Sequence, residues 1–162
     1  VQNSQLGYVL MATVGVEDEK VVFTSDVQGP MIKSTLDKIL VEKPQLVIVG
    51  GPPTYLAGFR VKVENIKAGL DNLKKLTESV QTTILEHHTL RDSNWESVCQ
   101  PIFDAAKNSG NRVCTAAEFV GKENNCLEFR RKQLFEIEPP GSDFEKWMKI
   151  PLQNRKTVKP PM

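Results

Sequence analysis

Short apolar runs rich in β-branched residues alternate in this chain with segments in which apolar residues recur at helical spacing. The runs cover residues 20–25, 45–49, 81–85 and 112–117, and the helical segments between them are centred on residues 31–40, 66–76 and 93–109. Strands that alternate with helices predict parallel, right-handed βαβ connections with the helices packed on the sheet. An acidic turn at residues 17–19 joins the first run to another apolar run, residues 6–14, as expected of a hairpin. We therefore expect an α/β fold in the order ββ-α-β-α-β-α.

Several local signals place element boundaries. Pro30 suits the first position of the first helix, and Pro44 should end that helix. The run at 45–49 is apolar throughout, which predicts a strand covered on both faces.

The third helix should open with a capping box, Ser93-x-x-Glu96, and end at Gly110. Pro101 should kink or split it. A charged helix is expected over residues 123–136. We expect residues 1–137 to form the main domain and residues 138–162, which hold five of the ten prolines, to form a tail or docking arm.

Length, net charge and cysteine content limit the classes of protein to which this chain can belong. The 162 residues suit one domain, and a formal net charge of +1 argues against a general binder of nucleic acid or anionic membranes. Cys99, Cys114 and Cys126 include no CxxC, so we expect reduced thiols in a cytoplasmic protein. We expect neither a secretory signal nor a membrane span. A start at Val1 is what a processed or truncated piece of a longer polypeptide would show.

In parallel α/β sheets, sites form in the loops that follow the carboxyl ends of strands. Asp26 follows the second strand. Its residue type alone favours a turn residue or helix cap, and its position also suits a metal ligand or general base. His87 and His88 are the only histidines, and they follow the fourth strand. Imidazole is a common metal ligand and general base, although a lone histidine is often a packing residue. Because side chains alternate along a strand, one of the two can face a cleft with Asp26, and Glu86 can orient it.

The loop at residues 50–55 lacks the glycine spacing of phosphate-binding loops. It either forms a rigid wall beside the site or is an ordinary connection between a strand and a helix. No GxSxG elbow makes Ser25 a nucleophile. Arg91 and Asp92 can form a local ion pair that fixes the histidine turn, or can simply be solvated.

Longer motifs surround these candidates: FTSDVQGP at residues 23–30, GPPTYL at 51–56, HHTLRD at 87–92 and TAAEF at 115–119. In order and spacing they resemble the carboxyl-terminal half of an uncharacterised archaeal family of metallo-β-lactamase-fold hydrolases. The resemblance covers roughly residues 6–135 and implies half of an αββα sandwich, in which two βα halves pack sheet to sheet around a metal site.

The resemblance also implies roles for individual residues. Asp26 matches the aspartate that bridges two metals, and either His87 or His88 matches a later histidine ligand. Zinc or another divalent metal is implied, with one or two ions in the complete site. Glu86 stands where family members tend to carry aspartate. The second shell or pocket is expected to comprise Ser25, Gly51, Pro52, Tyr55, Glu86, Arg91 and Asp92.

The HxHxDH ligand cluster of that superfamily is absent from these residues. A catalytic zinc generally takes three protein ligands, and one aspartate with one histidine does not meet that number. We therefore expect the carboxyl-terminal half of a longer or split hydrolase, whose metal-activated water would attack an unknown ester, amide or phosphodiester. Its partner would be the amino-terminal half, on the same or a separate chain, or another copy of this chain.

Two other functions fit the sequence. A non-catalytic binding or assembly subunit would use its sheet to dock to a partner chain, because an unpartnered half-sandwich exposes a large apolar face. A phosphoacceptor with Asp26 as the acceptor is the weakest alternative, since the acidic pair that would hold magnesium is missing.

Overall fold

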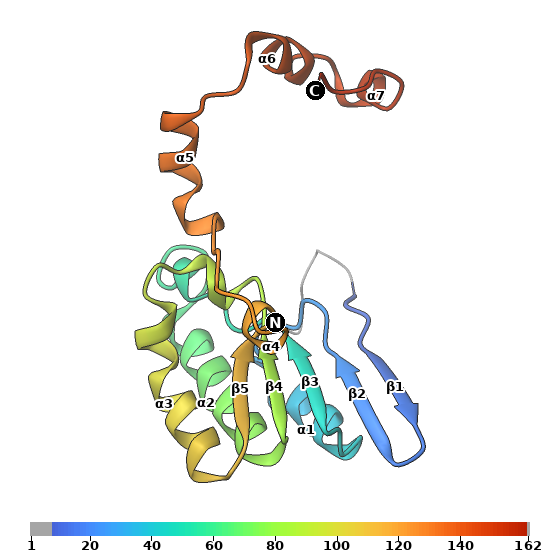
Figure 1. Cartoon of the computed structure of the whole chain (residues 1–162), viewed down its shortest axis with the longest axis vertical. Coiled ribbons are helices and arrows are strands. Elements are labelled where there is room, and N and C mark those ends of the chain that lie inside the picture. The colour runs from blue at the N-terminus through green and yellow to red at the C-terminus, as the bar shows by residue number, and fades with distance from the viewer. Residues whose placement is uncertain (1–7, 162) are drawn as a thin grey trace. The chain divides into compact units, whose positions relative to one another are not determined.

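The structure is a computed structural model that describes residues 8–161 (Figure 1). Its strands are β1 (Ala12–Val16), β2 (Glu19–Phe23), β3 (Leu46–Val49), β4 (Thr82–Leu85) and β5 (Arg112–Thr115). Its helices are α1 (Lys33–Val41), α2 (Val63–Ser79), α3 (Trp95–Asn108), α4 (Ala116–Phe119), α5 (Arg131–Ile137), α6 (Ser142–Met148) and α7 (Leu152–Arg155), with 3-10 turns η1 (Thr54–Leu56), η2 (Thr89–Arg91) and η3 (Glu128–Arg130). Described residues up to Cys126 form one compact unit, and those from Leu127 form a second.

The strands form one mixed sheet in sequence order, β1-β2-β3-β4-β5. The hairpin partners β1 and β2 are antiparallel, while β2, β3, β4 and β5 run parallel (Figure 1). The mixed α/β architecture predicted from the sequence is therefore confirmed, and the predicted order ββ-α-β-α-β-α matches the elements from β1 to α3. Among the described residues, β5 and four further helices follow. The expected first strand began at Leu6, and residues 6 and 7 lie outside the described part of the chain; within that part, β1 begins at Ala12.

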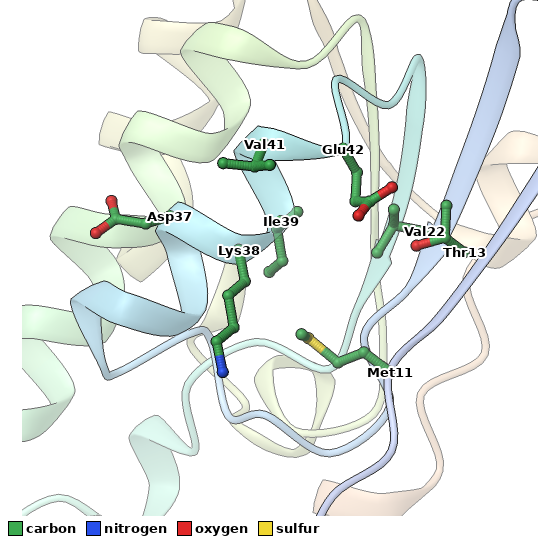
Figure 2. A pocket seen from close by; sticks show the side chains of 8 residues that line it. All are labelled: Met11, Thr13, Val22, Asp37, Lys38, Ile39, Val41 and Glu42. Atoms are coloured by element: carbon green, nitrogen blue, oxygen red, sulfur yellow. The ribbon is translucent and has the colours of Figure 1, made fainter.

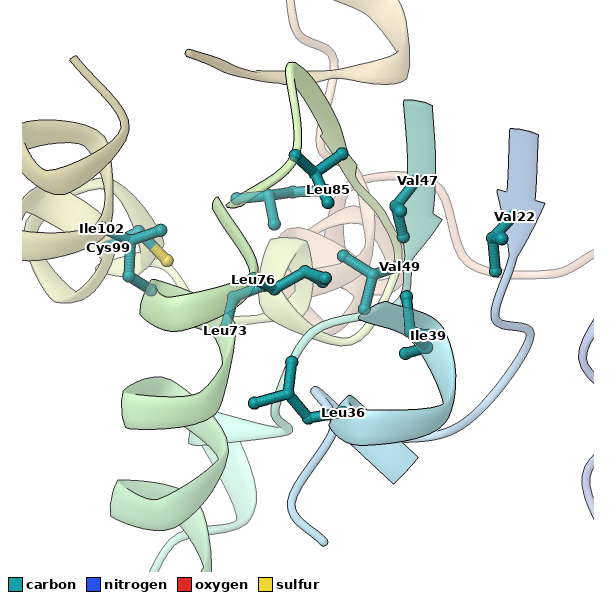
Figure 3. Packing of buried hydrophobic residues seen from close by; sticks show 11 residues of the cluster. Val22, Leu36, Ile39, Val47, Val49, Leu73, Leu76, Leu85, Cys99 and Ile102 are labelled. Atoms are coloured by element: carbon teal, nitrogen blue, oxygen red, sulfur yellow. The ribbon is translucent and has the colours of Figure 1, made fainter. Parts of the chain in front are cut away.

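The helices α1, α2 and α3 all cover the same face of the sheet. Strand order follows sequence order, so successive right-handed crossovers return on the same side. The buried cluster joins Val22, Val47, Val49 and Leu85 of the strands to Leu36 and Ile39 of α1, Leu73 and Leu76 of α2, and Cys99 and Ile102 of α3 (Figure 3). Burial of such side chains contributes about 1.5–3 kcal/mol each, which makes this layer the core of the first unit.

The opposite face of the sheet is open over β1, β2 and part of β3. The register pairs Val14 of β1 with Val21 of β2 on this face, and their side chains are 63% and 38% exposed. Phe23, two residues after Val21 on the same strand, is 44% exposed. Toward the other edge, α4 packs against β4 and β5, and Ile84 is buried there. The prediction that β3 is covered on both faces is wrong: Val47 and Val49 are buried, but the alternate residues are only half-buried, because the three long helices share one side.

Some predicted boundaries also differ. Helix α1 begins at Lys33 instead of Pro30, because the carbonyl of Pro30 accepts a hydrogen bond from the buried Asn72 side chain of α2. Helix α3 runs through Pro101 as one element. Ser97, whose carbonyl loses its donor to the proline, is exposed, so water can reach it.

The capping box predicted at Ser93 is not formed, because Asn94 is the N-cap residue and makes no side-chain cap bond. A capping box does open α4, where Thr115 accepts from the Glu118 amide. Gly110 follows α3 with a φ of +72°, as a residue after a helix C-cap should.

A hollow of about 470 Å³ lies between α1 and the hairpin (Figure 2). It opens where α1 stops short of covering β1 on the helix side. Its lining residues are Met11, Thr13, Val22, Asp37, Lys38, Ile39, Val41 and Glu42. None of these is a candidate site residue, so the hollow is separate from the chemistry described below.

In the second unit, Trp147 organises the short helices α6 and α7. Its indole N–H donates to the carbonyl of Val158 at 2.8 Å, and the Arg155 guanidinium lies 5.5 Å from the centre of its ring. Phe144 packs beside the same ring, with centroids 5.7 Å apart. The segment expected as a tail therefore has local structure of its own. Across residues 8–161, no helix is long and apolar enough to cross a membrane.

Candidate metal centre

The loops after β2, β3 and β4 meet at the carboxyl edge of the sheet. Backbone bonds continue past the strand ends: the amide of Thr24 donates to Ile48, and the amide of Glu86 donates to Val49. The carbonyl of Gly50 then accepts from the amides of His88 and Thr89, at 2.9 and 3.1 Å. This pairing brings the turn that carries the histidines over the end of β3 and toward the loop that carries Asp26.

Asp26, His87 and His88 converge at this edge. Their donor atoms all lie within 4.8 Å of one another. His88 Nε2 is hydrogen-bonded to Asp26 Oδ1, and His87 Nε2 lies 3.7 Å from the same oxygen. The two imidazole rings are tilted against each other with centroids 4.4 Å apart. The carboxylate is therefore a common point for both rings.

Both histidines reach Asp26, although alternation along a strand allows only one of two neighbours to do so. The reason is that β4 ends at Leu85. His88 already has helical backbone angles, φ −68° and ψ −49°, at the entry to η2. The turn brings its side chain back to the side that His87 occupies, so the rule for strand neighbours no longer applies.

The Asp26 loop carries backbone strain on both sides of the carboxylate. Ser25 and Gln28 have positive φ angles, 51° and 54°. The left-handed region costs an L-residue about 1–2 kcal/mol. Such strain persists where surrounding contacts over-determine a segment, and it gathers at functional sites. The fold thus holds Asp26 in place against a local backbone preference.

Gly50 forms the floor beneath the two rings. A Cβ at this position would lie 3.2 Å from His87 Cε1 and 3.4 Å from His88 Cδ2. The same atom would be 3.6 Å from the carbonyl oxygen of Ser25. A side chain here would therefore crowd the His87 ring and touch the His88 ring and the Asp26 loop, so the glycine leaves room for both imidazoles.

Side chains also tie together the loops that follow β3 and β4. Thr54 Oγ1 donates to Asp92 Oδ2 at 2.6 Å, and Arg91 Nη1 donates to the Tyr55 hydroxyl at 3.2 Å. The other carboxylate oxygen of Asp92 accepts from the amide of Asn94 at 2.9 Å. Asp92 therefore links the histidine turn to η1 and to the start of α3.

Gly51 and Pro52, which the sequence placed at the pocket, are both buried. A Cβ on Gly51 would lie 1.7 Å from Thr89 Oγ1. Pro52 fits between two glycines, because a Cβ on Gly29 or on Gly69 of α2 would lie 3.0–3.1 Å from its atoms. These residues fix where the three loops sit. Thr89 and Thr54 were not singled out in the sequence, and their place within two of the long motifs was the only signal for them.

Burial dominates the electrostatics of His88. Its side chain is 8% exposed, against 42% for His87 and 53% for Asp26. Desolvation lowers the pKa of the His88 imidazole, and the hydrogen bond and negative charge of Asp26 oppose that shift only in part. His88 is therefore neutral at pH 7. Glu86 lies on the other side of the pair, with its Oε2 3.7 Å from His87 Nδ1.

The chemistry of these donors fits a divalent metal. Two imidazoles and a carboxylate are the ligands that zinc and several first-row transition metals take in proteins. They lie at a partly exposed edge, with a glycine floor that leaves room for the rings. Asp26 and at least one imidazole would hold the ion, and Glu86 is placed to orient His87 through its second ring nitrogen.

The chain is similar to several archaeal proteins. The chain is 34% identical over 146 residues to a UPF0282 protein of Korarchaeum cryptofilum, which covers 90% of this chain and 49% of that protein. It is 40% identical over 133 residues to a UPF0282 protein of Methanopyrus kandleri, and 37% identical over 138 residues to one of Saccharolobus solfataricus. Each of these two matches covers 82% of this chain and 44% of the relative.

No protein-family model matches the chain, and no solved structure does. The chain spans somewhat less than half the length of each of these relatives. Its homologues are UPF0282 proteins, and the uncharacterised archaeal family expected from the sequence motifs fits them.

Proposed function

We propose that this chain is the carboxyl-terminal half of a metal-dependent hydrolase of the metallo-β-lactamase superfamily, with zinc as the expected ion. The observation that carries the proposal is the convergence of Asp26, His87 and His88 at the carboxyl edge of a parallel sheet. Strain at Ser25 supports it, because surrounding contacts must hold the Asp26 loop against a local backbone preference, and the close approach of the Gly50 backbone to both rings supports it as well.

A divalent metal at this edge would supply Lewis acidity, which polarises a carbonyl or phosphoryl oxygen and activates water for attack. Asp26 would hold the ion through its carboxylate and offset part of the ion's positive charge. At least one imidazole would provide a nitrogen donor, and the loop tied by Thr54 and Asp92 would form one wall. The substrate class of this proposal is an ester, amide or phosphodiester.

The proposal also requires a second layer of structure that packs on the open face of this sheet. The open sheet face presents Val14, Val21 and Phe23, and soluble proteins avoid contiguous apolar surface of this kind. The relatives are about twice as long as the matched region. We therefore infer that a second sheet, from the amino-terminal half of the same protein, packs on this face as in an αββα sandwich and adds the remaining ligands. Self-association through the same face is the alternative occupant.

A non-catalytic assembly subunit is the second candidate, and the open face favours it equally. The two proposals differ at the metal. Titration of the two halves together with zinc by calorimetry should show binding that is lost in Asp26→Ala and retained in Asp104→Ala, a control carboxylate on the exposed side of α3. Hydrolysis of ester or phosphodiester probes should need both halves of the protein together.

Two results would contradict the hydrolase. One is a purified two-half complex that contains no metal. The other is a complex that is indifferent to Asp26→Ala. Either would leave the assembly subunit as the better account. Tight zinc binding together with hydrolysis by this chain alone would instead refute its dependence on a second half.

A further inference from the structure

His87 and His88 are neighbours with different surroundings. Building on the proposed metal site, we propose that His87 is the metal ligand and that His88 is a positioning residue which holds the Asp26 carboxylate. The division rests on three observations: the spacing of each ring from Asp26, the partner of each second ring nitrogen, and the access of each ring to solvent.

Spacing separates the two imidazoles. Two ligands with bonds of about 2.0–2.2 Å to a shared tetrahedral ion lie about 3.3 Å apart. His87 Nε2 and Asp26 Oδ1, 3.7 Å apart, are too far for a hydrogen bond and close to that separation. His88 Nε2 is in hydrogen-bonding contact with the same oxygen, which leaves no space for an ion between them.

The second ring nitrogens point the same way. A histidine that ligates through Nε2 carries its proton on Nδ1 and normally donates it to a carboxylate or carbonyl. For His87 a carboxylate is present on that side, since Glu86 Oε2 lies 3.7 Å from Nδ1. The Nδ1 of His88 is buried and has no hydrogen-bond partner among the described residues. A proton there would be an unpaired buried donor.

The hydrogen bond to Asp26 fixes the opposite tautomer for His88. A carboxylate only accepts, so Nε2 of His88 must carry the proton and donate it. This N–H orients the Asp26 carboxylate and leaves the rest of that carboxylate for the ion. His87 is 42% exposed and can reach an ion that keeps an open coordination position, whereas His88 is 8% exposed.

The test compares the same substitution at adjacent positions. Glutamine places an amide N–H near the position of Nε2 but is a poor zinc ligand, so His88→Gln keeps the donor to Asp26 and His87→Gln removes a ligand. We expect zinc affinity, measured by calorimetry on this chain together with the amino-terminal half that completes the proposed site, to fall at least about 100-fold in His87→Gln. It should fall by less than about threefold in His88→Gln and by about 10–100-fold in His88→Ala.

Nitrogen chemical shifts of the rings give a readout that needs no variant. In the metal-free chain, His88 should show a protonated Nε2 and a bare Nδ1. On addition of zinc, only His87 Nε2 should show the shift of a ligating nitrogen. Urea unfolding of each variant separates loss of ligation from loss of folding.

Three outcomes would overturn the assignment. An equal loss of affinity in the two glutamine variants would make both rings ligands. Wild-type affinity in His87→Gln would transfer the ligand role to His88, as would a zinc-induced shift at His88 Nε2. If this chain and the amino-terminal half together bind no zinc, or if Asp26→Ala binds it unchanged in that complex, the proposed metal site itself fails. If that site holds and only the glutamine pair behaves otherwise, the division of roles alone is wrong.

Discussion

The contact between Gly51 and Thr89 can be measured separately from the backbone conformation that accompanies it. Gly51 has a φ of +73°, and a Cβ there would lie 1.7 Å from Thr89 Oγ1 and 2.9 Å from Thr89 Cβ. Gly110 has nearly the same φ, +72°, with nothing within 4 Å of the added atom. Gly110→Ala should therefore report the cost of the left-handed backbone alone, about 1–2 kcal/mol.

Gly51→Ala should add a steric term to that backbone cost. Overpacking a filled site costs about 1–3 kcal/mol, so we expect the free energy of unfolding to fall by about 2–5 kcal/mol, measured by urea denaturation. Thr89 is fully buried, and its amide, 3.5 Å from the added Cβ, would be in ordinary contact. Adding Thr89→Gly to Gly51→Ala should therefore recover the steric part, while Thr89→Ala should recover less because its Cβ remains.

A double-mutant cycle on Gly51 and Thr89 isolates this interaction from the separate cost of truncating Thr89. The reasoning would be refuted if Gly51→Ala and Gly110→Ala destabilised the chain equally, or if the cycle gave no coupling. Either result would mean that the histidine turn is not seated on the loop after β3, and the geometry drawn for His87 and His88 would lose its support.

Three further predictions follow from the site and the sheet. Ser25→Gly should stabilise the chain by about 0.5 kcal/mol in urea denaturation, because it relieves a positive φ but adds the entropy cost of glycine; a loss above about 1 kcal/mol would contradict strain at Ser25. The lowered pKa of His88 means that the unfolded chain binds more protons, so stability should be full above the ordinary histidine pKa of about 6.5 and fall as pH drops below it. Unfolding free energies from pH 5 to about 7.5 should show this slope in the wild type and a flatter one in His88→Gln. On the open face, Val14→Lys with Val21→Glu places opposite charges on directly paired residues, so it should weaken association with the amino-terminal half in sedimentation while changing the unfolding free energy of this chain by no more than about 0.5 kcal/mol; unchanged association would argue against this face as a docking surface.

The order of strands and helices from β1 to α3 could be predicted from the sequence. It depends on the local spacing of apolar residues and on the glycines and prolines that end each element. The strands β3 and β4 agree with the predicted runs to within one residue. Errors arose where a tertiary contact overrides a local preference. Pro30 is a good first residue for a helix, but the buried side chain of Asn72 holds its carbonyl outside α1.

The candidate site was predictable to the level of its loops and no further. Asp26 and the histidine pair could be located because carboxyl ends of parallel strands meet at one edge. What the pair does depends on where β4 stops pairing and turns, and this is set by backbone bonds from His88 and Thr89 to Gly50. No pattern within the motif HHTLRD encodes those bonds. The separate roles of His87 and His88 therefore could not be assigned from the sequence and depend on the three-dimensional structure.

The open face and the clustered loops have one topological cause. Parallel strands laid down in sequence order bring every strand end of β2, β3 and β4 to one edge, where the ligands gather. The same order sends every right-handed crossover to one side, so the helices cannot cover the other face. A chain with this topology therefore places its candidate ligands at the edge of a sheet that has helices on only one face. On the other face, α4 covers only β4 and β5. A second sheet that packs on β1, β2 and β3 would have strand ends beside Asp26 if its strands run to the same edge. A second sheet is therefore the partner best placed to supply further ligands.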